Sequence, residues 1–144
     1  MNTIKREGLV LPVTKSLCNY LLTLIKPEHQ TDQENKGSKS ITINFRDPDY
    51  SAESGGYHPV EISMFRQGDE WQLRYITGFS YVGVGHCAEL VKDTDFDFEQ
   101  GTFQSKIGIY PLDTVTEFYS IWEANFLAYS MEMEVFNISI TTED

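Results

Sequence analysis

Between Asp93 and Glu99 the chain reads Asp-Thr-Asp-Phe-Asp-Phe-Glu, with a carboxylate at every second position. In a β-strand successive side chains point to opposite faces, so Phe96 and Phe98 can enter a core while the carboxylates point outward. Like charges along one sheet face repel one another, and water, a cation or a basic partner must offset that cost. The stretch therefore predicts a strand with an acidic outer face formed by Asp93, Asp95, Asp97 and Glu99.

The same two-residue period recurs in other parts of the chain, which predicts further strands. Arg66-Gln67-Gly68-Asp69 separates two of these segments and is typical of a hairpin turn. Alternation with one polar face favours an antiparallel sheet over a parallel sheet that is buried on both sides. The alternating segments are Ile41–Phe45, Val60–Met64, Trp71–Tyr75, Phe136–Ile140 and, less strictly, Phe103–Ile109.

An amphipathic helix is predicted over about residues 10–26. Pro12 suits its first position, and Pro27 ends it because a proline disfavours helix at the residue before it. Residues 28–40 (EHQTDQENKGSKS) have no aliphatic or aromatic side chain, so we expect a mobile polar loop there. The apolar stripe that predicts the helix consists of Val10, Val13, Leu17, Leu21, Leu24 and Ile25.

A second helix is predicted over about residues 112–130, after Pro111. Thr114 and Glu117 have the spacing of a capping box. A final strand is expected over about residues 134–141, after a sheet over residues 40–110. This order predicts one α+β domain, a twisted antiparallel sheet of about six to seven strands flanked by N-terminal and near-C-terminal helices. The apolar face of the second helix, which we expect to be core, comprises Val115, Phe118, Tyr119, Trp122, Phe126 and Tyr129.

Composition narrows the class of protein. The chain has 144 residues, of which 40% are hydrophobic and 13% aromatic, so it fits one ordered domain. Cys18 and Cys87 form no Cys-x-x-Cys motif, and we expect reduced, packed thiols. Neither a signal peptide nor a membrane span is recognisable, so we expect a soluble cytoplasmic protein without membrane contact. The formal net charge of -11 disfavours direct binding to nucleic acid.

Three familiar motifs are present only in part. Gly83-Val84-Gly85-His86-Cys87-Ala88 matches a dinucleotide-binding pattern, but a strand follows where a helix is required, so the glycines indicate a bend or bulge. The acidic strand starts like an EF-hand loop but has Phe98 and Gln104 where glycine and glutamate are needed. The three histidines are scattered, which disfavours zinc. We expect no cofactor and no metal, although a looser calcium site on the acidic strand stays open.

A long loop between the first two strands is the second candidate site. Loops of this length in a compact domain are often functional. Tyrosine, histidine and carboxylate together can carry acid–base chemistry, but no recognisable nucleophile accompanies them, so we expect binding and no catalysis. The candidate binding residues of this loop are Arg46, Asp47, Asp49, Tyr50, Glu53, Tyr57 and His58.

This loop also carries a resemblance. Residues 46–62, RDPDYSAESGGYHPVEI, resemble the signature of the bacterial family called Domain of Unknown Function 2787. Proteins of this family occur in marine gammaproteobacteria and are often encoded on mobile genetic islands. Further matches are Tyr75–Tyr81, Asp95–Phe98, Gly101–Gln104 and Trp122–Tyr129.

The resemblance implies a fold like that of the acidic mitochondrial matrix proteins, in which a strongly twisted antiparallel sheet is flanked by terminal helices. Those proteins assemble as a ring-shaped trimer and bind many basic partners, including the globular heads of a complement component. A homo-oligomer is thus an expectation from the resemblance alone. The resemblance carries over no catalytic residue.

Three functions remain open at this stage. We favour a non-enzymatic interaction module that presents the acidic strand to a basic protein, with the 46–58 loop supplying specificity. The first alternative is a decoy from a mobile element, which imitates DNA and occupies the phosphate-binding groove of a nucleic-acid-binding protein. The second is a small-molecule binder or enzyme centred on Tyr50, Tyr57 and His58.

Overall fold

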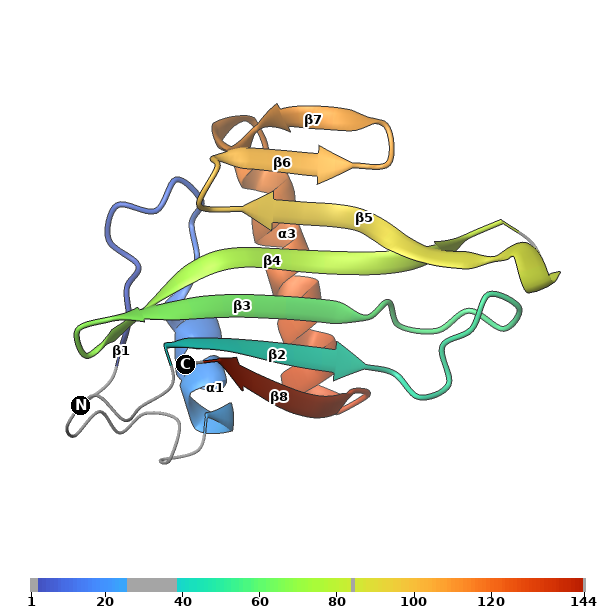
Figure 1. Cartoon of the computed structure of the whole chain (residues 1–144), viewed down its shortest axis with the longest axis horizontal. Coiled ribbons are helices and arrows are strands. Elements are labelled where there is room, and N and C mark those ends of the chain that lie inside the picture. Colours follow the sequence, from blue (N-terminus) through green and yellow to red (C-terminus); the bar gives the residue numbers. More distant parts are fainter. Residues whose placement is uncertain (1–2, 26–38, 84, 144) are drawn as a thin grey trace.

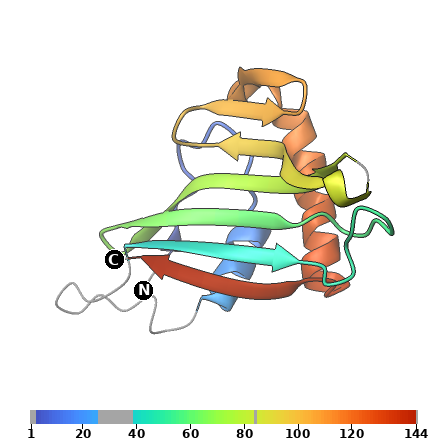
Figure 2. The same cartoon turned by 45° about the vertical axis from the view of Figure 1, so that its right-hand side comes forward.

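The computed structural model describes residues 3–25, 39–83 and 85–143. The strands of this part of the chain form one twisted sheet, and both α-helices lie behind it in the view of Figure 1. The same chain turned by 45° shows the longer helix running across the strands on that side (Figure 2). One face of the sheet is therefore covered by helices, and the other is open.

The helices are α1 (Lys15–Leu24) and α3 (Thr116–Leu127). The strands are β1 (Thr3–Ile4), β2 (Ser40–Arg46), β3 (Val60–Gln67), β4 (Glu70–Val82), β5 (Glu89–Asp97), β6 (Thr102–Ser105), β7 (Gly108–Pro111) and β8 (Asn137–Glu143). Their order in the sheet is β7-β6-β5-β4-β3-β2-β8, with antiparallel pairs, and β1 adds a short parallel pair to β4. The predicted α+β fold with its antiparallel sheet is confirmed.

The core lies between the inner face of the sheet and the two helices. Alternate residues of β2 and β3 point into it, and Ile41, Ile43 and Ile62 are fully buried. Phe96 of β5 meets Tyr119 of α3 edge to face, with ring centroids 5.0 Å apart. Burying a side chain of this size stabilises the fold by about 1.5–3 kcal/mol. The period of two thus identified the core-facing positions of β2, whereas in β4 the buried hydrophobic residues are Trp71, Leu73 and then Ile76, and Tyr75 is half-buried.

Glycines form both turns that flank β4. Gln67 pairs with Glu70 across the predicted hairpin turn, and Gly68 between them has φ 67°, a conformation that glycine adopts without steric cost. At the other end of β4, Gly83 has φ 89°, and a 3₁₀ turn at Gly85–Cys87 leads into β5. The second glycine cluster therefore makes a turn between strands.

The first helix is shorter than predicted. It begins after Thr14, whose hydroxyl accepts a hydrogen bond from the Leu17 N–H at 3.1 Å, so Pro12 does not start it. Val10 lies before the helix and is 53% exposed, whereas Leu11 and Val13 are buried in a non-helical segment in which the Val13 N–H donates to the Leu11 carbonyl at 2.9 Å. The apolar residues Val10 and Val13 of this segment therefore matched the helical spacing without being part of the helix. Pro27 and most of the loop expected at 28–40 lie outside the described residues.

The second helix is divided into three parts. A 3₁₀ turn at Leu112–Thr114 precedes α3, and a π-helical turn at Ala128–Glu132 follows it. The predicted capping box is wrong: the Thr114 hydroxyl donates to the carbonyl of Pro111 at 2.6 Å, and no side chain caps α3. None of the helices among the described residues has the length and apolar character needed to cross a membrane.

The expected strand over 103–109 is a hairpin of β6 and β7. Phe103 is buried, but Ile107 in the turn is 88% exposed and Ile109 on β7 is 66% exposed. The final strand, β8, begins at Asn137 rather than near 134 and pairs with β2. Both elements lie at edges of the sheet, where fewer neighbours bury a side chain.

Candidate binding pocket

A β-bulge interrupts the acidic strand. Gly78 of β4 pairs with Thr94, and Phe79 pairs with Lys92, so Asp93 is an extra residue in β5. Consequently Asp93 and Thr94 both line a pocket on the helix side of the sheet. A Cβ atom at Gly78 would lie 3.2 Å from Oγ1 of Thr94 and 3.4 Å from Oδ1 of Asp93. The glycine thus leaves room for the two polar side chains.

The four carboxylates do not share one open face, and that prediction is wrong. Asp95 does point to the open face, but it is 8% exposed and accepts a hydrogen bond from Oγ1 of Thr77 at 2.7 Å. Oδ1 of Asp97 accepts two backbone N–H groups of the turn after β5. Glu99 lies beyond the strand, with Oε1 3.4 Å from Nε of Arg74. Each of these three carboxylates therefore has a local partner in the structure.

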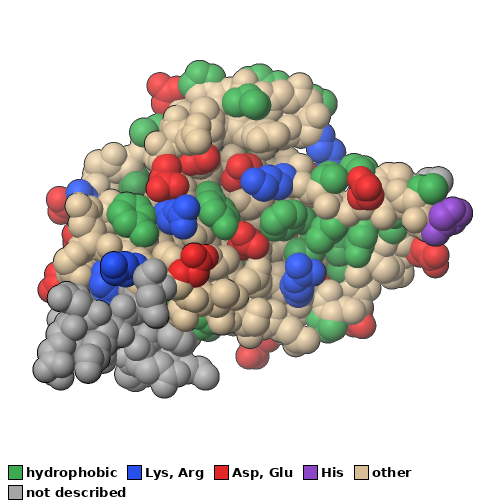
Figure 3. Space-filling view, in the orientation of Figure 1, with side chains coloured by type: hydrophobic (Ala, Val, Ile, Leu, Met, Phe, Trp, Pro, Cys, Tyr) green, Lys and Arg blue, Asp and Glu red, His purple; other side chains and the backbone are tan. Residues whose placement is uncertain are grey.

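The open face of the sheet is the one seen in Figure 3. Acidic side chains are interspersed there with Lys and Arg and with hydrophobic side chains (Figure 3). The Lys92 ammonium, for example, lies 3.9 Å from Oδ2 of Asp95. This face presents no continuous field of negative charge.

Asp47 organises the loop between β2 and β3. Its Oδ1 accepts the N–H of Asp49 at 2.9 Å, and its Oδ2 accepts the N–H of Tyr57 at 3.0 Å. Gly56 has φ 130°, and a Cβ atom there would lie 2.8 Å from Oδ2 of Asp47. The two bonds fold the loop back on itself, so that Tyr57 and His58 reach the pocket.

Other loop residues anchor the loop or remain in solvent. The Tyr50 hydroxyl accepts the N–H of Tyr81 at 3.1 Å, and the two rings stack with centroids 5.3 Å apart. Arg46, Asp49 and Glu53 are exposed and do not line the pocket. Figures 1 and 2 show this loop beside the β4–β5 turn at one end of the sheet. The loop is thus fixed to the sheet before it reaches the pocket.

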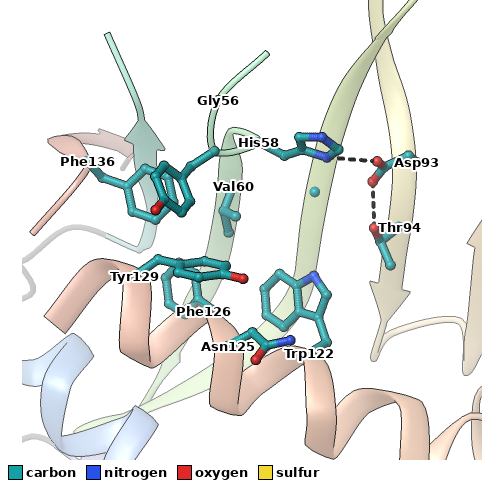
Figure 4. Close-up of a pocket in the computed structure, with 12 residues that line it drawn as sticks. Gly56, His58, Val60, Asp93, Thr94, Trp122, Asn125, Phe126, Tyr129 and Phe136 are labelled. Atoms are coloured by element: carbon teal, nitrogen blue, oxygen red, sulfur yellow. Dashed lines mark hydrogen bonds and ion pairs between the residues drawn. The ribbon is translucent and has the colours of Figure 1, made fainter. Parts of the chain in front are cut away.

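The loop, β5 and α3 enclose a pocket of about 410 Å³ (Figure 4). One wall is polar: Nδ1 of His58 lies 3.2 Å from Oδ2 of Asp93, and Oγ1 of Thr94 donates to Oδ1 of Asp93 at 2.5 Å. The Asp93 side chain is 17% exposed and that of His58 is 52% exposed. The other walls are mainly aromatic, with Val60 and Asn125 beside the rings of Tyr57, Trp122, Phe126, Tyr129 and Phe136.

The aromatic rings hold one another in place. Trp122 stacks on Phe126 at 5.4 Å with an interplanar angle of 7°, and Tyr57 contacts Tyr129 at 4.8 Å. Tyr129 belongs to the π-helical turn, a feature that is frequent at functional sites. In Figure 4 the Trp122, Asn125 and Tyr129 side chains rise from the helix toward the space below His58. The walls are therefore preformed.

A buried network positions α3 against α1. Glu123 is 2% exposed and accepts hydrogen bonds from the Tyr119 hydroxyl at 2.6 Å and from the Thr14 hydroxyl at 2.5 Å. Burial, together with the Glu123 carboxylate, raises the pKa of Tyr119. Burial also raises the pKa of the nearby Cys18 thiol to about 11. These groups are structural, and they fix the helix that carries the pocket wall.

The described lining of the pocket holds one carboxylate, Asp93, and one imidazole, His58, which lie against each other. No Lys or Arg is present among the described residues that line the pocket. Aromatic faces carry the negative part of their quadrupole and attract cations. Within the described part of the chain, no three His, Cys, Asp or Glu residues gather to hold a metal ion. The pocket thus suits an organic cation.

The structure joins two candidate sites that the sequence kept apart. Tyr57 and His58 of the loop meet Asp93 of the acidic strand in one pocket. Sequence reasoning assigned the rings of α3 to the core and missed Asn125. The spacing of Asn125 could have identified it as a pocket residue. It falls seven residues after Phe118 on the same helical face and places an amide among aromatic rings.

Comparisons with known proteins agree with the fold and the loop signature. The family model described as Protein of unknown function (DUF2787) matches residues 15–141. A hypothetical protein of Vibrio cholerae, VC0508 from the VSP-II pathogenicity island, is 34% identical, with a TM-score of 0.85 over 99% of this chain and 100% of that one.

A second Vibrio cholerae protein, VC1805 from pathogenicity island VPI-2, is 39% identical, with a TM-score of 0.75 over 94% of this chain and 98% of that one. It is described as sharing structural homology with the human P32 protein. The comparison with curated proteins gives no match. The family match spans most of the chain and includes the pocket loop, the bulged strand and α3, so the chain belongs to the DUF2787 family of proteins of unknown function.

Proposed function

We propose that this protein is a non-enzymatic binding module that recognises a guanidinium group of a basic partner protein in the pocket beside Asp93. One observation carries the proposal: the bulge turns the Asp93 carboxylate into an aromatic pocket whose described lining contains no Lys or Arg. This deepens the expectation of a basic partner. The proposal places the contact with the basic partner in the pocket and not on an acidic face of the sheet.

A guanidinium suits this lining better than an ammonium. It is planar, stacks on aromatic faces and offers several N–H donors in one plane. One face can lie against Trp122 while its edge donates to Asp93, and the Asn125 amide offers a further acceptor. Cation–π contact contributes about 0.5–2 kcal/mol and a charged hydrogen bond about 1.5–3 kcal/mol. Together these terms contribute about 2–5 kcal/mol, so a single side chain should bind with a dissociation constant of about 0.2–30 mM.

The arrangement of the polar wall argues against hydrolytic catalysis. In a catalytic triad the histidine stands between the acid and the nucleophile. Here Asp93 stands between His58 and Thr94, and the Thr94 hydroxyl donates directly to the carboxylate. In this arrangement Nδ1 of His58 faces the carboxylate of Asp93 and not the Thr94 hydroxyl. The mixed charge of the open sheet face likewise gives a DNA-imitating decoy no particular support (Figure 3).

The proposal is tested by an NMR titration with N-acetyl-arginine amide and its neutral isostere, N-acetyl-citrulline amide. The indole N–H signal of Trp122 should shift with the arginine compound, whereas that of Trp71, which is fully buried, should not. Asp93→Asn should weaken binding at least about tenfold, since it removes a charged hydrogen bond.

Asp69→Asn is the matched control because Asp69 is exposed in the β3–β4 turn, away from the pocket. This variant should bind the arginine compound like the wild type. Equal binding of the citrulline compound, or unchanged binding by Asp93→Asn, would overturn the proposal. The ring-shaped trimer implied by the resemblance stays a prediction, which light scattering on the purified protein checks.

A further inference from the structure

We infer that the pocket is one half of a groove along α3, and that the groove receives an extended segment of the partner whose apolar side chain lies three or four residues from the bound cation. This inference rests on the proposed function. It adds the kind of segment that the partner must present.

A second hollow adjoins the pocket. It measures about 460 Å³ and lies between α3 and the β6–β7 hairpin. Asp93 and Thr94 line both hollows, so the two meet at the bulge of β5. The bulge that turns Asp93 toward the helix therefore places a carboxylate at the junction of the two hollows.

One stripe along α3 and the π-helical turn that follows it forms the floor of both hollows. Phe118 lines the second hollow, while Trp122, Asn125 and Tyr129 line the pocket. These residues follow at intervals of four, three and four, which places them on one side of the helix. At about 1.5 Å per residue the stripe is roughly 16 Å long. An extended chain of about five residues spans the whole stripe, and about three residues span the roughly 10 Å from Phe118 to Asn125.

The second hollow has exposed apolar walls. Ile107 is 88% exposed and Phe118 is 45% exposed, and both line it. The Phe118 ring packs edge to face against Phe103, with ring centroids 5.6 Å apart. Apolar surface of this kind gains about 25 cal/mol for each Å² that a partner covers. An apolar side chain of the partner therefore suits this end.

Charge differs between the two ends of the groove. Lys106 lines the second hollow, whereas the described lining of the pocket contains no Lys or Arg. A second cation on the partner would be repelled at the Lys106 end. The net charge of -11 still draws a basic segment toward the protein as a whole. The groove thus specifies one arginine and one apolar residue in a fixed spacing.

The probes are two peptides, acetyl-Arg-Ser-Gly-Ser-Leu-amide and the reversed sequence acetyl-Leu-Ser-Gly-Ser-Arg-amide. Each peptide is compared by calorimetry with a version that has Ala in place of Leu. For one of the two sequences the Leu peptide should bind at least about tenfold tighter than its Ala version, since burying a leucine contributes about 1.5–3 kcal/mol. Lys in place of Leu should bind more weakly than Ala. An Arg-Leu dipeptide, which cannot span the two hollows, should show no gain from its leucine.

Variants of the protein test which residues contact the leucine of the peptide. Ile107→Ser and Phe118→Ala should abolish the advantage of Leu over Ala without changing the binding of N-acetyl-arginine amide. Ile107 lies in an exposed turn, so its variant should fold even if Phe118→Ala is destabilised. Ile121→Ser is the control, because Ile121 is 63% exposed on α3 but lines neither hollow.

The two proposals fail in different ways. If N-acetyl-arginine amide binds but leucine adds nothing in either order, the groove is overturned and the cation pocket stands. The groove is also overturned if the gain from leucine survives in Ile107→Ser and Phe118→Ala. If neither the amide nor the peptides bind, both proposals fall.

Discussion

Nδ1 of His58 lies 3.2 Å from Oδ2 of Asp93, although the two residues are 35 positions apart in the chain. The histidine comes from the loop between β2 and β3, and the aspartate comes from the bulge in β5. Their contact joins loop to sheet at the mouth of the pocket. The pocket therefore depends on backbone features at both ends of this contact, and substitutions there provide the clearest tests.

Gly56→Ala should destabilise the loop more than Gly55→Ala. Both glycines have positive φ, at 130° and 71°, and such strain costs about 1–3 kcal/mol in other residues. At Gly56 the added Cβ also meets Oδ2 of Asp47 at 2.8 Å, whereas nothing lies within 4 Å at Gly55. Urea unfolding of the two variants measures the difference. Equal losses would mean that the Asp47 contact does not constrain the loop.

Asp95→Ala should lower the free energy of unfolding by about 1–3 kcal/mol, because it leaves the buried Thr77 hydroxyl without its acceptor. Asp69→Ala, at an exposed turn position, should stay within about 0.5 kcal/mol of the wild type. Thermal and urea unfolding at neutral pH provide the measurement. A stabilising effect of Asp95→Ala would instead show that charge repulsion in the acidic strand outweighs its hydrogen bond.

Glu123→Gln should destabilise the protein by about 1–3 kcal/mol. The carboxylate accepts the Tyr119 and Thr14 hydroxyls and the Thr14 N–H, and an amide can offer only one oxygen to these donors. Glu117→Gln on the same helix is the control, since Glu117 is exposed. Urea midpoints that match for the two variants would show that the network contributes little to stability.

Stability should fall as the pH rises from 9 to 11. Burial raises the pKa of Cys18 from 9.0 to about 11, so between these values the unfolded thiol is ionised while the folded one keeps its proton. Unfolding then releases a proton, and each proton lowers stability by up to about 1.4 kcal/mol per pH unit in that window. Below pH 9 the contribution of this group is fully present.

The slope of the unfolding free energy between pH 9 and 11 should be shallower in Cys18→Ala than in the wild type. It should not vanish, because burial and a hydrogen bond to Glu61 raise the pKa of Tyr75 to about 12 and that group remains. Cys87→Ala is the control, since Cys87 is exposed. Parallel slopes in all three proteins would exclude Cys18 as the source.

The sheet was predictable because apolar and polar residues alternate within single strands. The buried residues Ile41 and Ile43 lie two positions apart in β2, and Ile62 and Met64 do so in β3. No distant contact is needed to recognise that period. The start of α1 was predicted less accurately, since Leu11 and Val13 are buried without being helical. A helical stripe and a short non-helical segment can bury the same apolar residues.

Sequence alone therefore determined the fold class, the antiparallel sheet, the turn at Gly68 and the loop residues that deserve testing, because these follow from local periodicity and backbone preference. The tertiary structure decided that Asp93 leaves the acidic face and meets His58 and Trp122 in one pocket. A bulge depends on how two strands register against each other, and register is set by contacts across the sheet that no single strand contains.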